Sequence, residues 1–439
     1  MDVLIMAGQL ILGLSILVGL HELGHLLTAK FFGMRVEQYS IGFPPKIWGK
    51  KFGETEYSIG AIPLGGFVKI SGMIDESLDT DAMKQPPKPW EFRAKPAWQR
   101  LIVMLGGIIV NIITGVLIFI AITYHDGGSY LSTTEVNKYG IVAGELGQEI
   151  GLRTGDKIIR VNGQAFEDFS DVRSSDVLLG SNSSYTVQRG NETVEILIPN
   201  DFVEKLSDKQ NVDRFIEPAL PFKVGELIPG LPAVQAGLKL GDRIVSINGQ
   251  PVRYYQEVQP LIKPLAGKSA AVVVERNGRL QTLNMNVTRE GTIGFRPASL
   301  LQPTIVKYSL GEAIGVGTRR AFSVVFDNIR GFGKIFRGEV SASKALSGPI
   351  GIAQNLFGGE WDWRRFWFVT GLLSMALAFM NALPIPALDG GHSTFLIYEI
   401  VSGRAPSDRF LENAQKVGMV LLLALMAFAI GNDLFKAIF

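Results

Sequence analysis

Residues 3–25 read VLIMAGQLILGLSILVGLHELGH, an apolar run that carries no charged side chain before its last five residues. A run of this length and polarity is typical of a helix that crosses a bilayer. Its last five residues, 21–25, form the pattern HExxH, which on a helix places His21 and His25 one turn apart on the same face, where both can bind one Zn²⁺. Glu22 lies beside them, in position to take a proton from a water on the metal. Because ionisable residues at membrane depth are costly, we interpret the motif as a metal site within the bilayer.

The composition limits both the class of protein and the ligands of a metal. Hydrophobic residues make up 47% of the 439 residues, and the net charge of +2 gives no indication of a nucleic-acid partner. Cysteine is absent, so a metal must be bound by His, Asp or Glu. The first apolar run has no basic segment before it, and cleavage after it would discard the motif. We therefore expect a retained span rather than a signal peptide.

Three further apolar segments, 101–124, 366–386 and 417–432, are candidates for membrane-spanning helices. With four spans, both termini lie on the same side of the membrane. Lysine and arginine are concentrated in residues 34–100 and recur between the third and fourth spans. The positive-inside rule then predicts that these two loops are cytoplasmic, and that the termini and the long segment between spans two and three lie on the outer side of the membrane.

The long outer segment contains an internal repeat. GLRTGDKIIRVNG at 151–163 aligns with GLKLGDRIVSING at 237–249. Each block predicts a Gly-Asp turn, a strand and an Asn-Gly hairpin, and the period is too long for a solenoid. Two tandem small domains are expected, each with one helix and β-rich sequence after the hairpin, at 168–179 and 184–198 in the first and at 254–265 and 269–287 in the second.

Three other segments have patterns of their own. Residues 36–70, rich in glycine and aromatic residues, predict β-hairpins that lie against the membrane or enter it. Residues 75–89 are acidic and then proline-rich, which indicates a flexible loop. Between residues 309 and 336, apolar positions recur at helical spacing opposite several arginines, which predicts an amphipathic helix on the membrane surface or against the spans.

A catalytic zinc requires three protein ligands, so the two histidines need a partner. The stretch NALPIPALDGGH, residues 381–392, offers Asp389 directly after a charge-free span. Spacing alone leaves open a second interpretation of Asp389, as the cap of a cytoplasmic helix, because Asp-Gly-Gly is ordinary turn chemistry. We expect His125 to be interfacial or exposed. His392 is expected near the site or facing the surface, and neither histidine is assigned as a ligand.

The two motifs together, HELGH in the first span and NALPIPALDG in a later one, resemble the site-2 protease family of intramembrane zinc metalloproteases over essentially the whole chain. The repeats resemble tandem PDZ domains, as in the Gram-negative branch of the family that regulates the sigma-E response. The resemblance implies His21, His25 and Asp389 as ligands of one Zn²⁺ per chain and Glu22 as the catalytic base. It also implies a substrate-binding segment that contains Asn381, Pro384 and Pro386.

The expected fold is a polytopic α-helical membrane protein with four transmembrane helices, a membrane-associated β-hairpin region and two tandem PDZ-like α+β domains. Its expected segments, in chain order, are the first span with the HExxH motif (1–33), the hairpin region and loop (34–97), the second span (98–125), the first PDZ domain (126–218), the second PDZ domain (219–300), the amphipathic helix and connector (301–365), the third span (366–390), a cytoplasmic loop (391–415) and the fourth span (416–439).

The resemblance implies a bacterial inner-membrane endopeptidase, surrounded by lipid, that cleaves single-span membrane proteins. Anti-sigma factor-like proteins and signal-peptide remnants are the implied substrates. Prolines in the binding segment free backbone carbonyls, and the edge of a hairpin in 36–70 is expected to pair with an unwound substrate. The PDZ-like repeats lack a clear Gly-Leu-Gly-Phe loop, which leaves both peptide binding and a size filter open. The alternatives are a non-catalytic PDZ scaffold, against which the intact motifs argue, and a metal transporter, against which the charge-free second and third spans argue.

Overall fold

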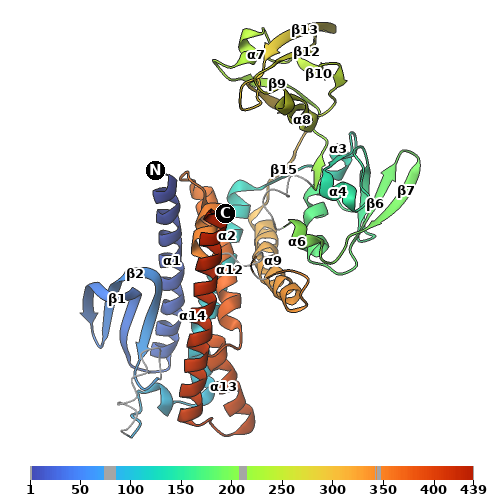
Figure 1. Cartoon of the computed structure of the whole chain (residues 1–439). Helices are drawn as coiled ribbons and strands as arrows, with labels where there is room; N and C mark the ends of the chain where they lie inside the picture. Colours follow the sequence, from blue (N-terminus) through green and yellow to red (C-terminus); the bar gives the residue numbers. More distant parts are fainter. Residues whose placement is uncertain (1, 74–85, 207–214, 342, 344–347, 439) are drawn as a thin grey trace. The chain divides into compact units, whose positions relative to one another are not determined.

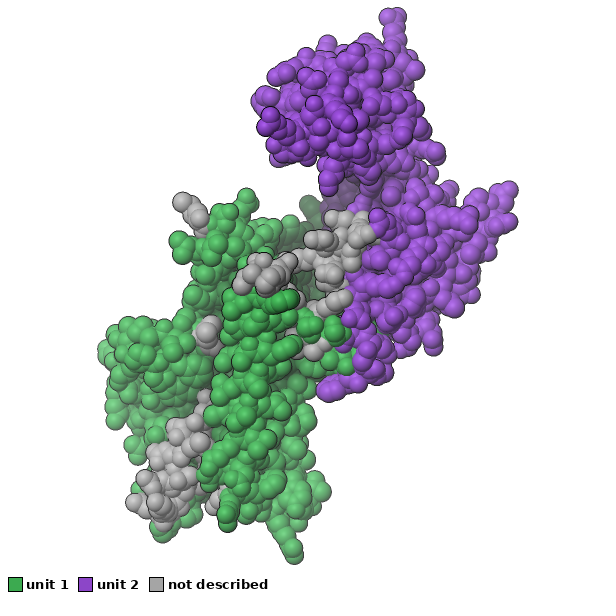
Figure 2. Space-filling view, viewed as in Figure 1, with its two compact units in different colours: residues 1–127, 307–335, 341–439 green, residues 128–306, 336–340 purple. Residues whose placement is uncertain are grey.

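The computed structural model describes residues 2–73, 86–206, 215–341, 343 and 348–438. Most of the loop predicted at 75–89 lies outside the described residues. The chain divides into two compact units (Figure 2). Unit 1 comprises residues 1–127, 307–335 and 341–439, and unit 2 comprises residues 128–306 and 336–340.

The described residues of unit 1 form four helices long and apolar enough to cross a membrane, as the sequence predicts. Helices α1 and α12 both pack against α2 (Figure 1). Helices α2 and α14 extend beyond the apolar segments that predicted them at both ends, whereas α12 ends before the two prolines of the NALPIPALDG segment. Proline lacks the N–H that a helix interior needs, so the helix cannot continue through them. The bounds are α1 (Asp2–Phe31), α2 (Ala97–Asp126), α12 (Trp363–Ala382) and α14 (Asp408–Ile438).

A further helix, α13 (Asp389–Ser402), occupies part of the segment 391–415, which was predicted as a cytoplasmic loop between the third and fourth spans, and this helix was not predicted. The helix ends at Gly403, which has a φ of +69°, the left-handed conformation that glycine adopts at no steric cost. The apolar residues of 395–401 gave a helical signal that was too short to separate from the neighbouring spans. Helix α13 packs against α2 and begins at the candidate ligand Asp389.

Two strands follow α1, β1 (Val36–Phe52) and β2 (Thr55–Ile70), and they pair antiparallel. Residues 38–41 of β1 pair with residues 56–59 and also with residues 66–69 of β2. Within the described part of the chain, residues 66–70 pair on one side only, so they form an edge of this small sheet. A short 3₁₀ turn, η2 (Phe92–Ala94), precedes α2.

The amphipathic helix predicted at 309–336 is α9 (Leu310–Phe336). Its buried residues include Ala313, Gly317 and Ala321, spaced by one turn. Gly317 lies against α2, where a Cβ atom at this position would be 2.7 Å from the Ile120 Cα. The small residues therefore let α9 approach α2 closely. Two short helical segments, α11 (Pro349–Ile352) and the π-helix η7 (Ala353–Phe357), lead into α12.

Unit 2 contains the two repeats, each with its own hydrophobic core. The first repeat has a three-stranded sheet of β5 (Lys157–Val161), β6 (Ser184–Arg189) and β7 (Glu192–Leu197). The second has a four-stranded sheet in the order β11-β10-β12-β13. Its strands are β10 (Arg243–Ile247), β11 (Gln250–Pro251), β12 (Ser269–Arg276) and β13 (Arg279–Asn286).

The helices predicted at 168–179 and 254–265 are each divided into short pieces. These are η3 (Phe169–Arg173) and α5 (Ser175–Leu178) in the first repeat, and η5 (Tyr255–Glu257), α8 (Val258–Ile262) and η6 (Lys263–Leu265) in the second. The remaining elements of unit 2 are β3 (Gly128–Tyr130), α3 (Thr133–Val136), β4 (Ile141–Ala143), α4 (Glu145–Glu149), α6 (Phe202–Leu206), β8 (Ile216–Pro218), β9 (Phe222–Leu227), α7 (Pro232–Gln235), β14 (Phe295–Ser299) and β15 (Thr304–Val306).

The two repeats share one ion pair in equivalent positions. The guanidinium of Arg276 donates to both carboxylate oxygens of Asp242, at 2.7 and 2.6 Å, and to the carbonyl of Gly237. Arg189 donates in the same way to Asp156 and to the carbonyl of the glycine that begins the first block. In both repeats the aspartate is that of the Gly-Asp turn, so the repeated sequence blocks fold into the same local structure.

Candidate metal centre

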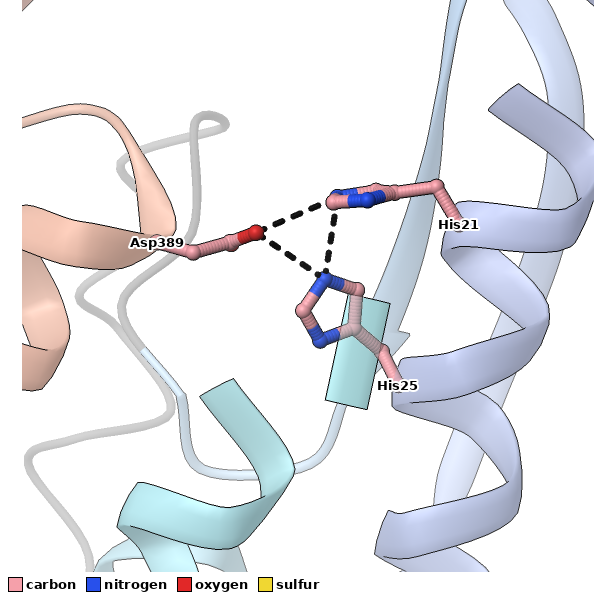
Figure 3. A group of neighbouring side chains, drawn as sticks. All are labelled: His21, His25 and Asp389. Atoms are coloured by element: carbon pink, nitrogen blue, oxygen red, sulfur yellow. Dashed lines mark hydrogen bonds and ion pairs between the residues drawn. The ribbon is translucent and has the colours of Figure 1, made fainter. Parts of the chain in front are cut away.

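Three side chains from two distant parts of the sequence meet within unit 1 (Figure 3). His21 and His25 extend from the same face of α1, and Asp389 extends from the first turn of α13. The Asp389 Oδ2 lies 3.1 Å from the His21 Nε2 and 3.4 Å from the His25 Nε2, and the two imidazole nitrogens are 3.2 Å apart. The structure thus brings together the three residues that the sequence proposed as ligands.

The three atoms fit a zinc ion. Zinc bound tetrahedrally at about 2.0–2.2 Å from N and O ligands holds neighbouring ligand atoms roughly 3.3 Å apart. The separations of 3.1–3.4 Å match this value. The buried Asp389 Oδ2 also accepts no hydrogen bond from the described residues, which leaves its lone pairs for a metal. Three protein ligands leave the fourth position of a catalytic site for water or substrate.

Helix α2 orients both imidazoles. The Nδ1–H of His25 donates to the carbonyl of Val103 at 2.8 Å, which leaves Nε2 with its lone pair for a metal. On the other ring, the side-chain amide of Asn111 lies 3.1 Å from the Nδ1 of His21. If His21 binds a metal through Nε2, its proton is on Nδ1, which then needs an acceptor. The Asn111 side-chain oxygen has no other partner among the described residues, and a 180° flip of the amide brings this oxygen to Nδ1. The Ser374 hydroxyl of α12 donates to the main-chain carbonyl of Asn111.

Glycine allows α1 and α2 to touch at the site. A Cβ atom on Gly24 would lie 2.3 Å from the carbonyl oxygen of Gly106. A Cβ atom on Gly107 would lie 2.5 Å from both the Cε1 of His21 and the Nε2 of His25. The backbone of α2 therefore forms a wall of the site, and no larger residue fits at these positions without movement.

A non-helical connection positions Asp389. It begins after Ala382, contains both prolines and includes Ala387, whose φ of +82° is rare for a residue with a side chain. The N-cap of α13 is Leu388, and no side chain caps this helix. Asp389 therefore does not cap the helix, the second interpretation left open by its spacing, and its carboxylate faces the two histidines instead. Gly391 approaches the connection closely, since a Cβ atom there would lie 2.4 Å from the Ile385 carbonyl oxygen.

A cavity of about 650 Å³ adjoins the three side chains. Glu22 lines it, as do Asn381, whose Nδ2 lies 3.4 Å from the His21 Nε2, and residues 65–70 of β2. Among the described residues, Pro384 and Pro386 do not line this cavity. The two prolines lie in the non-helical break between α12 and α13.

The remaining two histidines differ in position. The side chain of His125 is 88% exposed and bonded to Asp126, in line with the exposed position expected for it. His392 lines the cavity, one of the two positions that its spacing left open. Sequence reasoning also missed the Val103 carbonyl, which has no signal of its own, and Gln415, a glutamine of α14 that lines the cavity. A polar residue near the start of an apolar segment was the available signal for Gln415.

The chain is similar to known proteins over almost its whole length. The profile described as peptidase family M50 matches residues 9–425. The regulator of sigma-E protease RseP of Escherichia coli is 30% identical over 455 residues, covering 96% of this chain and 97% of that protein. The regulator of sigma E protease of Haemophilus influenzae is 27% identical with 98% of both chains covered. A protein of Neisseria meningitidis whose name describes it as a zinc metalloprotease is 29% identical, covering 96% of this chain and 97% of its own.

Proposed function

The chain belongs to peptidase family M50, the site-2 protease family, as a zinc metalloprotease, and we propose that it is an endopeptidase that cleaves single-span membrane proteins within the bilayer. The observation that carries the proposal is the meeting of two histidines of α1 with Asp389 beside a cavity. Helix α1 is long and apolar enough to cross a membrane. A metal-ligand group on such a helix supports the proposal that the reaction takes place at membrane depth.

In this proposal, His21, His25 and Asp389 would hold one Zn²⁺, which would lower the pKa of a bound water and polarise the scissile carbonyl. Glu22, next to His21 on α1 and in the cavity wall, takes the proton of the attacking water and returns it to the leaving amine. Asn381, with its amide near His21, orients the substrate carbonyl.

The substrate segment must be extended for this reaction, because a helix hides its peptide bonds in its own hydrogen bonds. Residues 66–70 of β2 form a sheet edge and also line the cavity. An unwound segment that pairs with this edge satisfies its main-chain groups by strand addition. Pro384 and Pro386 contribute by keeping the connection that leads to Asp389 non-helical, and we include them with Asn381 in the substrate-binding segment.

The biological setting follows from the relatives. Two of them carry the name regulator of sigma-E protease, so we propose anti-sigma factor-like single-span proteins as substrates, with signal-peptide remnants as a second class. The protein then resides in the bacterial inner membrane, in contact with lipid, with its termini and unit 2 in the periplasm and the active site towards the cytoplasm. The two repeats of unit 2 are proposed to be PDZ-like domains that admit only substrates already shortened on the periplasmic side.

The test is cleavage of a tagged single-span substrate by the purified protein, with zinc content measured on the same samples. We expect wild type to contain one zinc per chain and to cleave, and Glu22→Gln to keep the zinc but lose cleavage. Glu54→Gln, the same chemical change at an exposed position in the β1–β2 turn, serves as the matched control. Equal cleavage by wild type and Glu22→Gln would leave the non-catalytic scaffold as the better description.

A further inference from the structure

Helix α14 contacts the rest of unit 1 near both of its ends. Among its described residues, those that are buried are Gln415, Gly418 and Asp433. At one end, Asp433 accepts hydrogen bonds from the main-chain nitrogens of Gly348 and Gly351. At the other, a Cβ atom on Gly418 would lie 1.7 Å from the Pro386 carbonyl oxygen. The first part of α14 therefore packs on the non-helical connection that leads to Asp389.

Gln415 lies three residues before Gly418, on the same face of the helix. It is 3% exposed, and it lines the cavity that His21, Glu22 and Asp389 also line. No hydrogen bond joins its carboxamide to any described residue. The side chain as a whole is buried, but its amide atoms are not fully buried and face the cavity, whereas leucine or methionine would serve the packing of an apolar helix equally well. The carboxamide of Gln415 is therefore available to a polar group that enters the cavity.

The chemistry of that partner follows from the amide itself. A carboxamide offers one acceptor oxygen and an NH₂ donor, which match the N–H and the C=O of a peptide main chain. An unwound membrane segment carries such groups unpaired into a medium that lacks water to satisfy them. The edge of β2 satisfies groups on one side of an extended chain. The other side requires donors and acceptors from elsewhere in the cavity wall.

We propose that Gln415 is a substrate-binding residue, whose carboxamide hydrogen-bonds the main chain of the extended substrate segment beside the metal site. This assignment rests on the proposed intramembrane proteolysis and deepens it. It makes α14 a wall of the substrate site as well as a membrane anchor. Because the contact is to the main chain, it favours unwound segments of many sequences rather than one particular side chain.

The first test compares Gln415→Met, which keeps the length of the side chain and removes the amide, with Asn413→Leu, the same loss of an amide at an exposed position of α14. We expect Gln415→Met to raise KM for a single-span substrate by about tenfold with zinc content unchanged. We expect the Asn413→Leu variant to match wild type. A wild-type KM in Gln415→Met overturns the assignment, as does a loss confined to zinc content, which would indicate a structural residue.

The second test does not depend on cleavage. The chain has no cysteine, so Gln415→Cys introduces a single thiol. In the Glu22→Gln background, we expect this thiol to form a disulfide under mild oxidation with single cysteines placed near the cleavage position of the substrate. We expect none from Asn413→Cys. If Gln415→Cys forms no disulfide with the substrate, the assignment is overturned. If the disulfide forms but the wild-type protein cleaves no substrate, the proposed function is refuted and the assignment of Gln415 to substrate binding is not.

Discussion

Gly107 of α2 lies against His25 of α1, so closely that a Cβ atom on Gly107 would be 2.5 Å from the Nε2 that faces Asp389. A Cβ atom cannot lie this close to another heavy atom, so one of the two helices or the imidazole must move when any side chain is added. The same Cβ atom would lie equally close to the ring of His21. The separation of α1 and α2 is therefore part of the geometry of the metal site.

Gly107→Ala is expected to displace both imidazoles and to lower cleavage on the order of a hundredfold, the cost of misplacing reacting groups by about 1 Å. Zinc content should fall with it. The matched control is Gly8→Ala in α1, since a Cβ atom on Gly8 meets no atom within 4 Å. Zinc analysis and cleavage assays on the two variants test this expectation. Full activity in Gly107→Ala would show that α1 and α2 can separate without loss of the metal site.

The amide of Asn111 is expected to fix the ring of His21. Asn111→Leu removes the hydrogen bond to Nδ1 and leaves the main-chain carbonyl available to Ser374. Loss of such a supporting contact lowers metal affinity by about 10–100-fold. Competition with a chelator of known affinity measures the change, with Asn328→Leu on α9, whose amide bonds only within its own helix among the described contacts, as the comparison. Unchanged zinc affinity in Asn111→Leu would mean that packing alone orients the ring.

The sequence predicted the residues of the site more completely than the fold around them. The HELGH pattern predicted His21 and His25 as a ligand pair, whereas the spacing of Asp389 left a helix cap open and only the family resemblance implied it as the third ligand. The structure places the three side chains within ligand distance of one another. The Val103 carbonyl was not predictable, because every residue has a carbonyl and only the α1–α2 packing selects this one. Helix α13 was missed because its apolar signal is short and follows a span closely.

Zinc removal is expected to abolish cleavage reversibly. A strong chelator should remove activity, and added Zn²⁺ should restore it, whereas Mg²⁺ should not, because two of the three ligand atoms are imidazole nitrogens. Asp389→Asn should weaken zinc binding at least about tenfold, since it replaces a charged ligand by a neutral one. Asp201→Asn, at an exposed position of unit 2, is the control for the same substitution. Activity that persists after complete removal of zinc would contradict the proposed mechanism.

The ion pair of Arg100 and Glu399 is expected to hold α13, and with it Asp389, against α2. The two side chains are 16% and 18% exposed. Removal of one partner leaves a largely buried charge unpaired, so Glu399→Gln or Arg100→Met should each lower the free energy of unfolding by about 3 kcal/mol and reduce zinc content. The exchanged pair, Arg100→Glu with Glu399→Arg, should recover part of both. A double-mutant cycle measures the coupling, and strictly additive effects would show that the pair does not position α13.

The second repeat of unit 2 is expected to lose stability in acid through Asp242. Burial raises the pKa of this carboxyl, but hydrogen bonds from Arg276 and from the main-chain N–H of Lys239 outweigh it, so the pKa lies below its ordinary value. A carboxyl whose pKa is lower in the folded state stabilises the fold above its unfolded pKa of about 3.9, and this contribution is lost as the pH falls through the folded pKa.

Hydrogen exchange of residues 243–247 in the full chain, measured at neutral pH and at two values below about pH 4, tests this expectation. Protection of this strand should fall on acidification in wild type. Asp242→Asn should exchange about tenfold faster at neutral pH and should respond less to acid, because the lost hydrogen bonds no longer depend on protonation. Glu226→Gln, which breaks the exposed pair with Arg296, should alter exchange by less than about twofold. An acid response in Asp242→Asn equal to that of wild type would assign the loss to another carboxyl.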